Sequence, residues 1–339
     1  MAQTANELTL GFNSFVAYLQ YRMQRLKKHY YAYVSPLKLT NELYREKLGR
    51  IPDLRHPSTF NEKVLWMKHF SDTTRWSQLA DKYRVREYVE QCGLGWMLNE
   101  LYAVWERPEE IDLTLPQLQG REFVLKTNNG CGDVILVPDA RTADLKSIRH
   151  KMKRALRYHY GFKTAEHHYI SIKPCIIAEK MLHENPALSC SLIDYKFFCL
   201  DGEPCYCMVC YDRRGHEGFK TCLYDAHTWE PLNHYINPSH YTPGQRQIPR
   251  PASLDRMLDA ARRLAHGFPE VRVDLYEIDG HPVFGELTFT SAAGISPRFT
   301  EEFQRMMGAR ITLPEKALPN RMPTGFVLFR HPEQSDSEA

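Results

Sequence analysis

The chain has 339 residues, which is long enough for two lobes or one large multi-layer domain. Its 43% hydrophobic and 25% charged residues are typical of a globular protein and exclude disorder throughout the chain. The formal net charge of +3 is too small to indicate a nucleic-acid-binding protein. No apolar run approaches the roughly 18 residues of a membrane-spanning helix, and the first residues do not resemble a secretion signal. We therefore expect a cytoplasmic protein.

The nine cysteines are an odd number spread over a long chain, which fits reduced thiols better than a disulfide framework. Three of them, Cys205, Cys207 and Cys210, lie close together in a segment that reads as a strand. A zinc site would need a second pair at a suitable spacing. We expect these three to be small buried strand residues.

The first predicted element is a helix over residues 8–28. Its apolar residues recur every three or four positions on one face: Phe12, Val16, Leu19, Met23 and Leu26. It ends in the basic residues Arg22, Arg25, Lys27 and Lys28. Such a helix favours packing on the protein's own body, with weak contact to an anionic membrane surface as the alternative.

The next elements are two helices and two strands separated by polar turns. Ser58 or Thr59 can cap a helix, with Glu62 in its first turn. A second helix over Asp81–Val89 is stopped by Gly93. The residues that follow predict a strand, an acidic loop and a short buried strand, over 96–104, 108–116 and 123–125.

Strands and helices then alternate to the end of the predicted fold. The predicted helices are 144–157 and 253–266, and the predicted strands are 134–137, 175–179, 195–200, 206–211, 271–278 and 282–287. The last two strands form a hairpin that turns at Asp279-Gly280. The fold class is therefore α+β, or mixed α/β.

Three segments could contact a nucleotide. Lys126 ends a buried strand and is followed by a loop with Gly130 and Gly132, where backbone N–H groups could approach a phosphate. By itself an ordinary turn explains this loop better, because it matches neither common glycine-rich phosphate motif. Glu179 ends an apolar strand and could accept a hydrogen bond from an adenine amino group, or it could form a solvated ion pair. Lys82, near the start of a helix, could reach the same phosphates or face solvent.

The predicted hairpin carries the strongest chemical pattern. Alternation places Arg272 and Asp274 on one face of the first strand, and Glu286 and Thr288 on one face of the second. Two carboxylates beside an arginine form, in outline, a magnesium and phosphate site. A cross-strand ladder of salt bridges on a wet face is the equal alternative.

Read in chain order, these segments resemble the ATP-grasp superfamily, and more closely its TupA-like branch of teichuronopeptide-synthesis proteins. The resemblance covers roughly residues 55–312 and rests on six segments that fall in family order: Ser58–Lys63, Ala80–Val89, Phe123–Lys126, Asp194–Phe198, Val271–Tyr276 and Gly285–Thr288. It implies that two α+β lobes enclose ATP. The domain limits that we predict are an N-terminal helical extension (1–55), an N-terminal α/β region (56–120), a nucleotide-binding lobe with a glycine flap (121–190), a lobe with the metal and phosphate site (191–315) and a tail (316–339).

The resemblance also implies ATP and Mg²⁺ as cofactors. It assigns Lys82 and Lys126 to the phosphates, Gly130 and Gly132 to the flap, and Glu179, Lys180, Leu182 and Lys196 to the adenine and the nucleotide cleft. It assigns Asp274, Glu286 and Thr288 to Mg²⁺ and Arg272 to the transferred phosphoryl group. Thr288 departs from the family, which usually has Asn there, so that the metal would be held more loosely or water would complete its shell.

The implied reaction joins a carboxylate to an amine through an acyl phosphate and releases ADP and phosphate. The partners would be an acidic small molecule or saccharide and an amine, in the synthesis of a cell-surface polysaccharide. Candidate substrate contacts are Arg213, Arg214, Ser291, Gly294 and Arg298. Three alternatives stay open: a glycosyltransferase, which the absence of an Asp-x-Asp triplet disfavours, an ATP-grasp kinase, and a non-catalytic nucleotide-binding relative.

Overall fold

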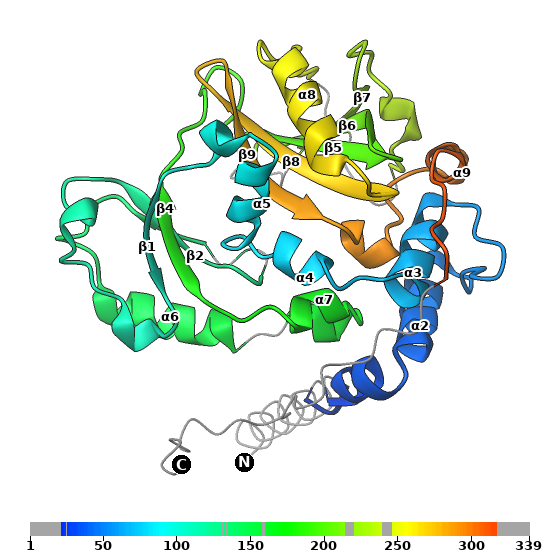
Figure 1. The fold of residues 1–339 in the computed structure, drawn as a ribbon, viewed down its shortest axis with the longest axis horizontal. Coiled ribbons are helices and arrows are strands. Elements are labelled where there is room, and N and C mark those ends of the chain that lie inside the picture. Colours follow the sequence, from blue (N-terminus) through cyan, green and yellow to red (C-terminus); the bar gives the residue numbers. More distant parts are fainter. Residues whose placement is uncertain are drawn as a thin grey trace, which may run out of the picture.

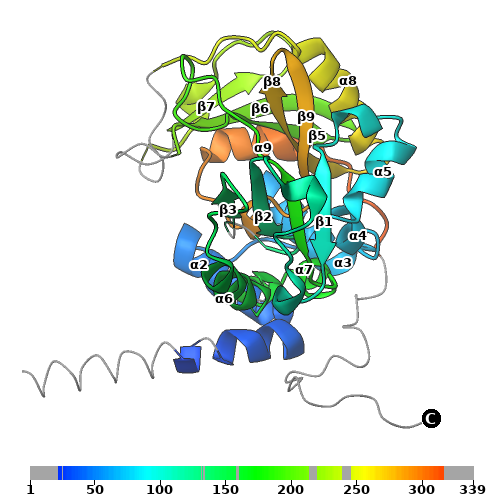
Figure 2. The ribbon, with the colours of Figure 1, turned by 90° about the vertical axis from the view of Figure 1, so that its left-hand side faces the viewer.

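Two antiparallel sheets organise the molecule, with the five-stranded sheet above the four-stranded sheet in Figure 2. The computed structural model describes residues 22–316, except for 25, 131, 133, 158–159, 214–219 and 239–245. Among these residues, no helix is both long and apolar enough to cross a bilayer. The mixture of helices and sheets confirms the predicted fold class.

The five-stranded sheet has the order β7-β6-β5-β8-β9. Its strands are β5 (Asp194–Leu200), β6 (Glu203–Tyr211), β7 (Lys220–Asp225), β8 (Glu270–Ile278) and β9 (His281–Thr288). Alternate residues such as Phe197 and Val273 point to one face, where helix α8 (Leu254–Ala265) covers them with Met257 and Leu264. Figure 1 shows α8 lying across this face. The sequence missed β7, whose segment carries no clear alternation.

The predicted hairpin of β8 and β9 is confirmed. Asp279 and Gly280 both have positive φ, 50° and 72°, as a two-residue hairpin turn requires. The register shifts after Asp274, where Gly285 forms a bulge. A Cβ at Gly285 would lie 2.8 Å from the main-chain oxygen of Asp274, so only glycine fits there. The bulge is what places Glu286 directly opposite Asp274.

The four-stranded sheet has the order β1-β4-β2-β3. Its strands are β1 (Leu101–Trp105), β2 (Phe123–Thr127), β3 (Val134–Val137) and β4 (Ile176–Lys180). Helix α6 (Leu145–Leu156), capped by Asp144, packs Ile148 and Met152 against the sheet. The strand predicted over 96–104 begins only at Leu101, because Gly95–Met97 form a 3-10 turn (η1).

Short turns fill the remaining connections. The predicted acidic loop contains one 3-10 turn, η2 (Pro108–Glu110), and a second one, η3 (Pro116–Leu118), begins at its last residue. Three others are η4 (Tyr160–Lys163), η5 (Asn233–Tyr235) and η6 (Ser291–Gly294). The predicted limits of the domains stay a prediction.

Five further helices surround the sheets: α2 (Pro36–Leu48), α4 (Trp76–Leu79), α5 (Val85–Gln91), α7 (His167–Ile170) and α9 (Glu301–Ala309). Helix α3 (Phe60–Phe70) begins with the predicted capping box of Thr59 and Glu62. The helix predicted over 81–89 begins only at Val85. The Asp81 side chain accepts the N–H groups of Tyr83 and Arg84 and holds them in a turn.

The helix predicted over 8–28 lies largely outside the described residues. Residues 26–34 are helical, so the helix continues past its predicted end. Cys205, Cys207 and Cys210 are buried in β6, as expected for strand residues.

Helices α3 and α9 cover part of the sheet face opposite α8, where Phe60 contacts Phe198 and Phe303 contacts Tyr206. Charged residues occupy the rest of that face.

Candidate functional site

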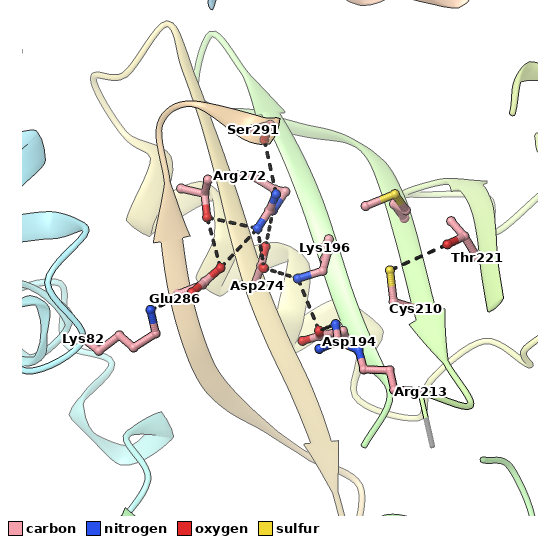
Figure 3. Close-up of polar contacts among 12 residues, drawn as sticks. Lys82, Asp194, Lys196, Cys210, Arg213, Thr221, Arg272, Asp274, Glu286 and Ser291 are labelled. Atoms are coloured by element: carbon pink, nitrogen blue, oxygen red, sulfur yellow. Dashed lines mark hydrogen bonds and ion pairs between the residues drawn. The ribbon is translucent and has the colours of Figure 1, made fainter. Parts of the chain in front are cut away.

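A chain of charged side chains crosses the sheet face opposite α8 (Figure 3). Lys82 Nζ lies 3.3 Å from Glu286 Oε2, and the other oxygen of Glu286 lies 3.2 Å from Arg272 Nη2. Arg272 donates hydrogen bonds to both carboxylate oxygens of Asp274, from Nε at 2.6 Å and from Nη2 at 2.7 Å. Lys196 forms an ion pair with the same Asp274 carboxylate. Four segments of the sequence therefore meet at one place.

The chain of charges continues past Lys196 to the next residue pair. Lys196 Nζ lies 3.3 Å from Asp194 Oδ2, and Arg213 forms an ion pair with the same oxygen. From end to end the sign of the charge alternates along Lys82, Glu286, Arg272, Asp274, Lys196, Asp194 and Arg213. Each charged group between the two ends of this series, Lys82 and Arg213, has an opposite charge on both sides. These neighbours offset the cost of taking that group out of water.

Neighbouring charges also fix the protonation states at the centre. Burial alone would raise the pKa of Glu286, but Lys82, Lys196 and Arg272 outweigh it and hold that pKa well below its ordinary value. Burial would lower the pKa of Arg272, whereas Asp274 and Glu286 raise it above its ordinary value. Glu286 and Arg272 are therefore both charged at neutral pH.

Two hydroxyl groups complete the surroundings of Arg272. Its Nη2 donates to Thr288 Oγ1 at 3.0 Å, and its Nη1 lies 3.5 Å from Ser291 Oγ. Thr288 in turn donates to Glu286 at 3.3 Å. Asp274, Glu286 and Thr288 thus offer two carboxylates and one hydroxyl on adjacent strands, all within reach of one guanidinium.

This donor set meets the needs of Mg²⁺ only in part. Within the described part of the chain, no group of three or more His, Cys, Asp or Glu side chains could hold a metal ion by itself. Mg²⁺ usually binds through one or two carboxylates while phosphates and waters complete its octahedron. The residues present fit Mg²⁺ when it arrives with a phosphate group, and they do not form a self-sufficient metal cage.

The four-stranded sheet reaches this site through Lys82. Its Nζ donates to the main-chain oxygen of Gly130 at 2.8 Å, and its own N–H donates to Asn128 at 3.1 Å. Asn128 is fully buried, and its side chain bonds the main chain at Lys173 and Cys175. Lys82 therefore ties the loop after β2 to Glu286 on β9. Sequence reasoning missed Asn128, although it stands in the loop that carries Gly130.

Lys126 and Glu179 form a second charged group on the four-stranded sheet. Lys126 Nζ lies 2.7 Å from Glu179 Oε2, and Arg86 Nη1 lies 3.8 Å from Glu179 Oε1. The main-chain groups of Lys180 are already paired, since its N–H donates to Glu100 and its oxygen accepts from Asn99. Arg86 was missed; it lies at the start of α5, in the same predicted segment as Lys82, and that shared segment is the signal that could have found it.

The candidate substrate residues separate in space. Arg213 and Ser291 belong to the charged chain or touch it, whereas Arg214 lies outside the described residues. Arg298 Nη1 lies 3.0 Å from the sulfur of Met208, which is opposite Lys196 in the sheet. Gly294 faces helix α3 instead, where an added Cβ would lie 2.9 Å from the Leu65 side chain.

A buried polar network supports the segment that follows β9. Thr290 donates to Glu166, which also accepts from Thr164, and Lys68 Nζ donates to the main-chain oxygen of Thr164 at 3.0 Å. Burial raises the pKa of Glu166 and lowers the pKa of Lys68 to about 8. Thr290 precedes Ser291, so the network positions the hydroxyl that touches Arg272. Sequence reasoning did not find this network.

The site therefore lies where the loop after β2 meets the charged face of the five-stranded sheet, through the ion pair of Lys82 and Glu286. The family model for TupA-like ATP-grasp proteins matches residues 62–312, more than half of the chain. The chain belongs to this family. The predicted membership is confirmed, and so is the cofactor prediction at the level of the family, since ATP-grasp ligases use ATP and Mg²⁺. No curated protein sequence matches the chain.

Solved structures of ATP-grasp ligases are similar to this chain. D-alanine–D-alanine ligase from Bacillus anthracis, complexed with ATP, is 14% identical with a TM-score of 0.41, over 68% of this chain and 61% of that one. The ligase PsnB, complexed with a precursor variant, Mg and ADP, is 11% identical with a TM-score of 0.40, over 71% and 61%. The chain spans about three fifths of the length of these two structures.

Proposed function

We propose that the protein is an ATP-dependent ligase that joins a carboxylate to an amine. The observation that carries this proposal is the ion pair between Lys82 and Glu286, because it brings the loop of Gly130 and the acids of the five-stranded sheet to one place. A phosphate-binding loop and a pair of acids for Mg²⁺ must meet in this way to handle one nucleoside triphosphate. Membership in the ATP-grasp family supports the same reaction class.

The four-stranded sheet would bind the nucleotide. Lys82 and Lys126 would hold its phosphates, with Gly130 and Gly132 in the loop that covers them. Gly132 has a φ of 87° and open space where a Cβ would be, which suits a loop whose N–H groups turn toward an anion. Glu179 and the main chain of Leu182 would contact the adenine, while the paired main chain of Lys180 holds β4 beside β1. We also propose that residues 121–190 and 191–315 are the two lobes that enclose ATP.

The five-stranded sheet would carry the chemistry. Asp274 and Glu286, with Thr288, would hold Mg²⁺, which neutralises charge on the phosphates of the nucleotide. Arg272 contacts both acids, so its guanidinium stands where it can stabilise the transferred phosphoryl group. Lys196 beside Asp274 adds a further cation. These groups act by position and charge, which is what phosphoryl transfer requires of a protein.

In the proposed reaction, an oxygen of the acid forms a bond to the γ-phosphorus and ADP leaves. The amine nitrogen then attacks the carbonyl carbon of the acyl phosphate, phosphate leaves and the amine gives up a proton. We propose that the acid is a saccharide or small-molecule precursor of a cell-surface polymer, handled in the cytoplasm at the inner face of the membrane. Support comes from the sequence resemblance to teichuronopeptide-synthesis proteins and from the cations Arg213 and Arg298 on the site face.

The test is a screen of acids and amines with purified protein, Mg²⁺ and ATP, in which ADP, AMP and amide product are measured. We expect ADP and phosphate only when both an acid and an amine are present. Lys126→Ala and Asp274→Asn should each lower turnover at least 100-fold, by analogy with losing a charged group from a transition state (about 3 kcal/mol). Lys151→Ala, which removes an exposed lysine of α6, is the matched control and should keep full activity.

Three outcomes would contradict the proposal. AMP with pyrophosphate would indicate adenylation in place of an acyl phosphate. ADP with a phosphorylated alcohol would indicate a kinase. Consumption of a sugar nucleotide without any need for ATP would indicate a glycosyltransferase.

A further inference from the structure

Residues 22–24 and 26–34 are helical and expose an apolar face at one end of the molecule, below α2 in Figure 1. Met23, Leu26, Tyr30 and Val34 follow one another at three- and four-residue spacing and are 69%, 55%, 59% and 57% exposed. Residues so spaced share one side of a helix. We name these four residues the N-terminal apolar stripe.

The exposed apolar residues are concentrated in this part of the chain. Of the eleven large hydrophobic residues that are exposed among the described residues, six lie between residues 23 and 37. The other five are scattered: Ile51, Trp96, Val134, Leu136 and Met306. Single exposed hydrophobic residues are normal on a protein surface, whereas a contiguous group of them marks a surface that something covers.

The opposite side of the same helix is already in contact with the body of the protein. Ala32 is fully buried, and its main-chain oxygen is 2.9 Å from Nε2 of His167 in α7. His29 packs edge-on against Phe162, with ring centroids 4.9 Å apart. The helix is therefore held in a fixed orientation with its apolar stripe facing outward.

The charge around the stripe favours one kind of occupant. Between Glu7 and Glu42 the sequence has no acidic residue, and it has five basic ones: Arg22, Arg25, Lys27, Lys28 and Lys38. Phospholipid surfaces of the cytoplasmic leaflet are anionic and attract basic residues that flank an apolar face. A second copy of the helix would bring the same positive charge and be repelled.

We propose that the N-terminal apolar stripe docks the protein on an anionic membrane surface. Leu26 and Tyr30 enter the boundary between headgroups and acyl chains, while Lys27, which is next to Leu26 and exposed, lies at the level of the lipid phosphates. Because the helix is fixed to the body, docking holds the whole molecule in one orientation on the membrane. This inference does not depend on the proposed ligase reaction.

The experiment measures binding of the full chain to vesicles by co-sedimentation. Vesicles of phosphatidylcholine alone are compared with vesicles that contain 30% phosphatidylserine, each at low and at high salt. We expect binding only to the anionic vesicles, and we expect it to weaken with salt, since each basic residue near the surface contributes about fivefold to affinity. The variant Leu26→Glu/Tyr30→Glu should bind at least about tenfold more weakly, because it removes two inserted side chains.

The matched control is Ile51→Glu/Met306→Glu, which makes the same change at two exposed apolar residues outside the stripe. It should bind vesicles like the unaltered protein. Equal binding to neutral and anionic vesicles, or equal weakening in both variants, would overturn the proposal. It would also be overturned if vesicles were bound only after residues 317–339 were removed, or if Leu26→Glu/Tyr30→Glu dissociated a dimer without affecting vesicles. ATP turnover of the variants shows separately whether the nucleotide site is intact.

Discussion

The alternating charges around Asp274 predict how the protein responds when one of them is removed. Asp274 lies between Arg272 and Lys196, and its side chain is 2% exposed. Asp274→Asn removes the negative charge and leaves the two cations facing a neutral amide. Breaking a buried pair in this way costs about 3–5 kcal/mol of unfolding free energy. In a chain of this size such a loss lowers the melting temperature on the order of 10 °C.

A second substitution tests whether charge balance is the cause. Lys196→Met removes the surplus cation, and Asp194 keeps its ion pair with Arg213. The double variant Asp274→Asn/Lys196→Met should therefore recover about 1.5–3 kcal/mol relative to the sum of the two single variants. Asp274→Asn and the double variant should both be inactive, because each lacks the acid proposed to hold Mg²⁺.

The assay is a double-mutant cycle from urea unfolding curves, with Mg²⁺-dependent ATP binding measured by calorimetry on the same four proteins. A coupling free energy near zero would refute the alternating-charge reasoning. Retained Mg²⁺-dependent ATP binding in Asp274→Asn would refute the metal role of Asp274 while leaving the stability reasoning intact.

Three further predictions concern single residues. Neither carboxyl oxygen of Glu270 has a hydrogen-bond partner among the residues described, and burial raises its pKa well above the ordinary value, only partly offset by Arg272. Native Glu270 therefore keeps its proton at a pH where the unfolded chain loses it, which is above about pH 4.3, so this group lowers the stability of the fold as the pH rises. Glu270→Gln should therefore stabilise the protein at pH 8 and do so much less at pH 4. An equal effect on urea unfolding at both pH values would contradict this. Thr288→Asn supplies an amide oxygen as ligand and should lower the Mg²⁺ concentration for half-maximal turnover about fivefold in a magnesium titration; an unchanged or higher requirement would speak against a ligand at this position. Gly308→Ala would place a Cβ 2.2 Å from the main-chain oxygen of Ser58 and should cost at least about 2 kcal/mol in the same unfolding assay, whereas a neutral effect would mean that α9 can shift away from α3.

Much of the local structure could be predicted from the sequence because it depends on neighbouring residues. Alternation along a strand places Arg272 and Asp274 on one face wherever that strand lies, and the two are bonded in the structure. Asp279-Gly280 favours a two-residue turn by its own backbone preferences, and the turn is there. The Thr59 and Glu62 cap likewise depends on residues three positions apart.

The sequence predicted some element boundaries and some side-chain neighbours wrongly, at places where a side-chain contact overrides the local pattern. The helix predicted from Asp81 starts later, because the Asp81 carboxylate bonds the N–H groups that the first helical turn would contain. Gly285 reads in the sequence as a weak strand residue, and only the close main-chain oxygen of Asp274 shows why it forms a bulge. Gly294 reads as a pocket residue, yet its neighbours are the side chains of α3.

The sequence by itself predicted which residues are candidates for the chemistry, and it determined which face of a strand Arg272 and Asp274 share, since that depends on a spacing of a few residues. Only the tertiary structure decided that Lys82 meets Glu286, that Arg86 joins Lys126 at Glu179, and that the signs of the charges alternate across the sheet. These contacts between distant residues depend on the order of strands in the sheets, on the bulge at Gly285 and on the closure of long loops. Those are properties of the whole chain, and no short segment contains them.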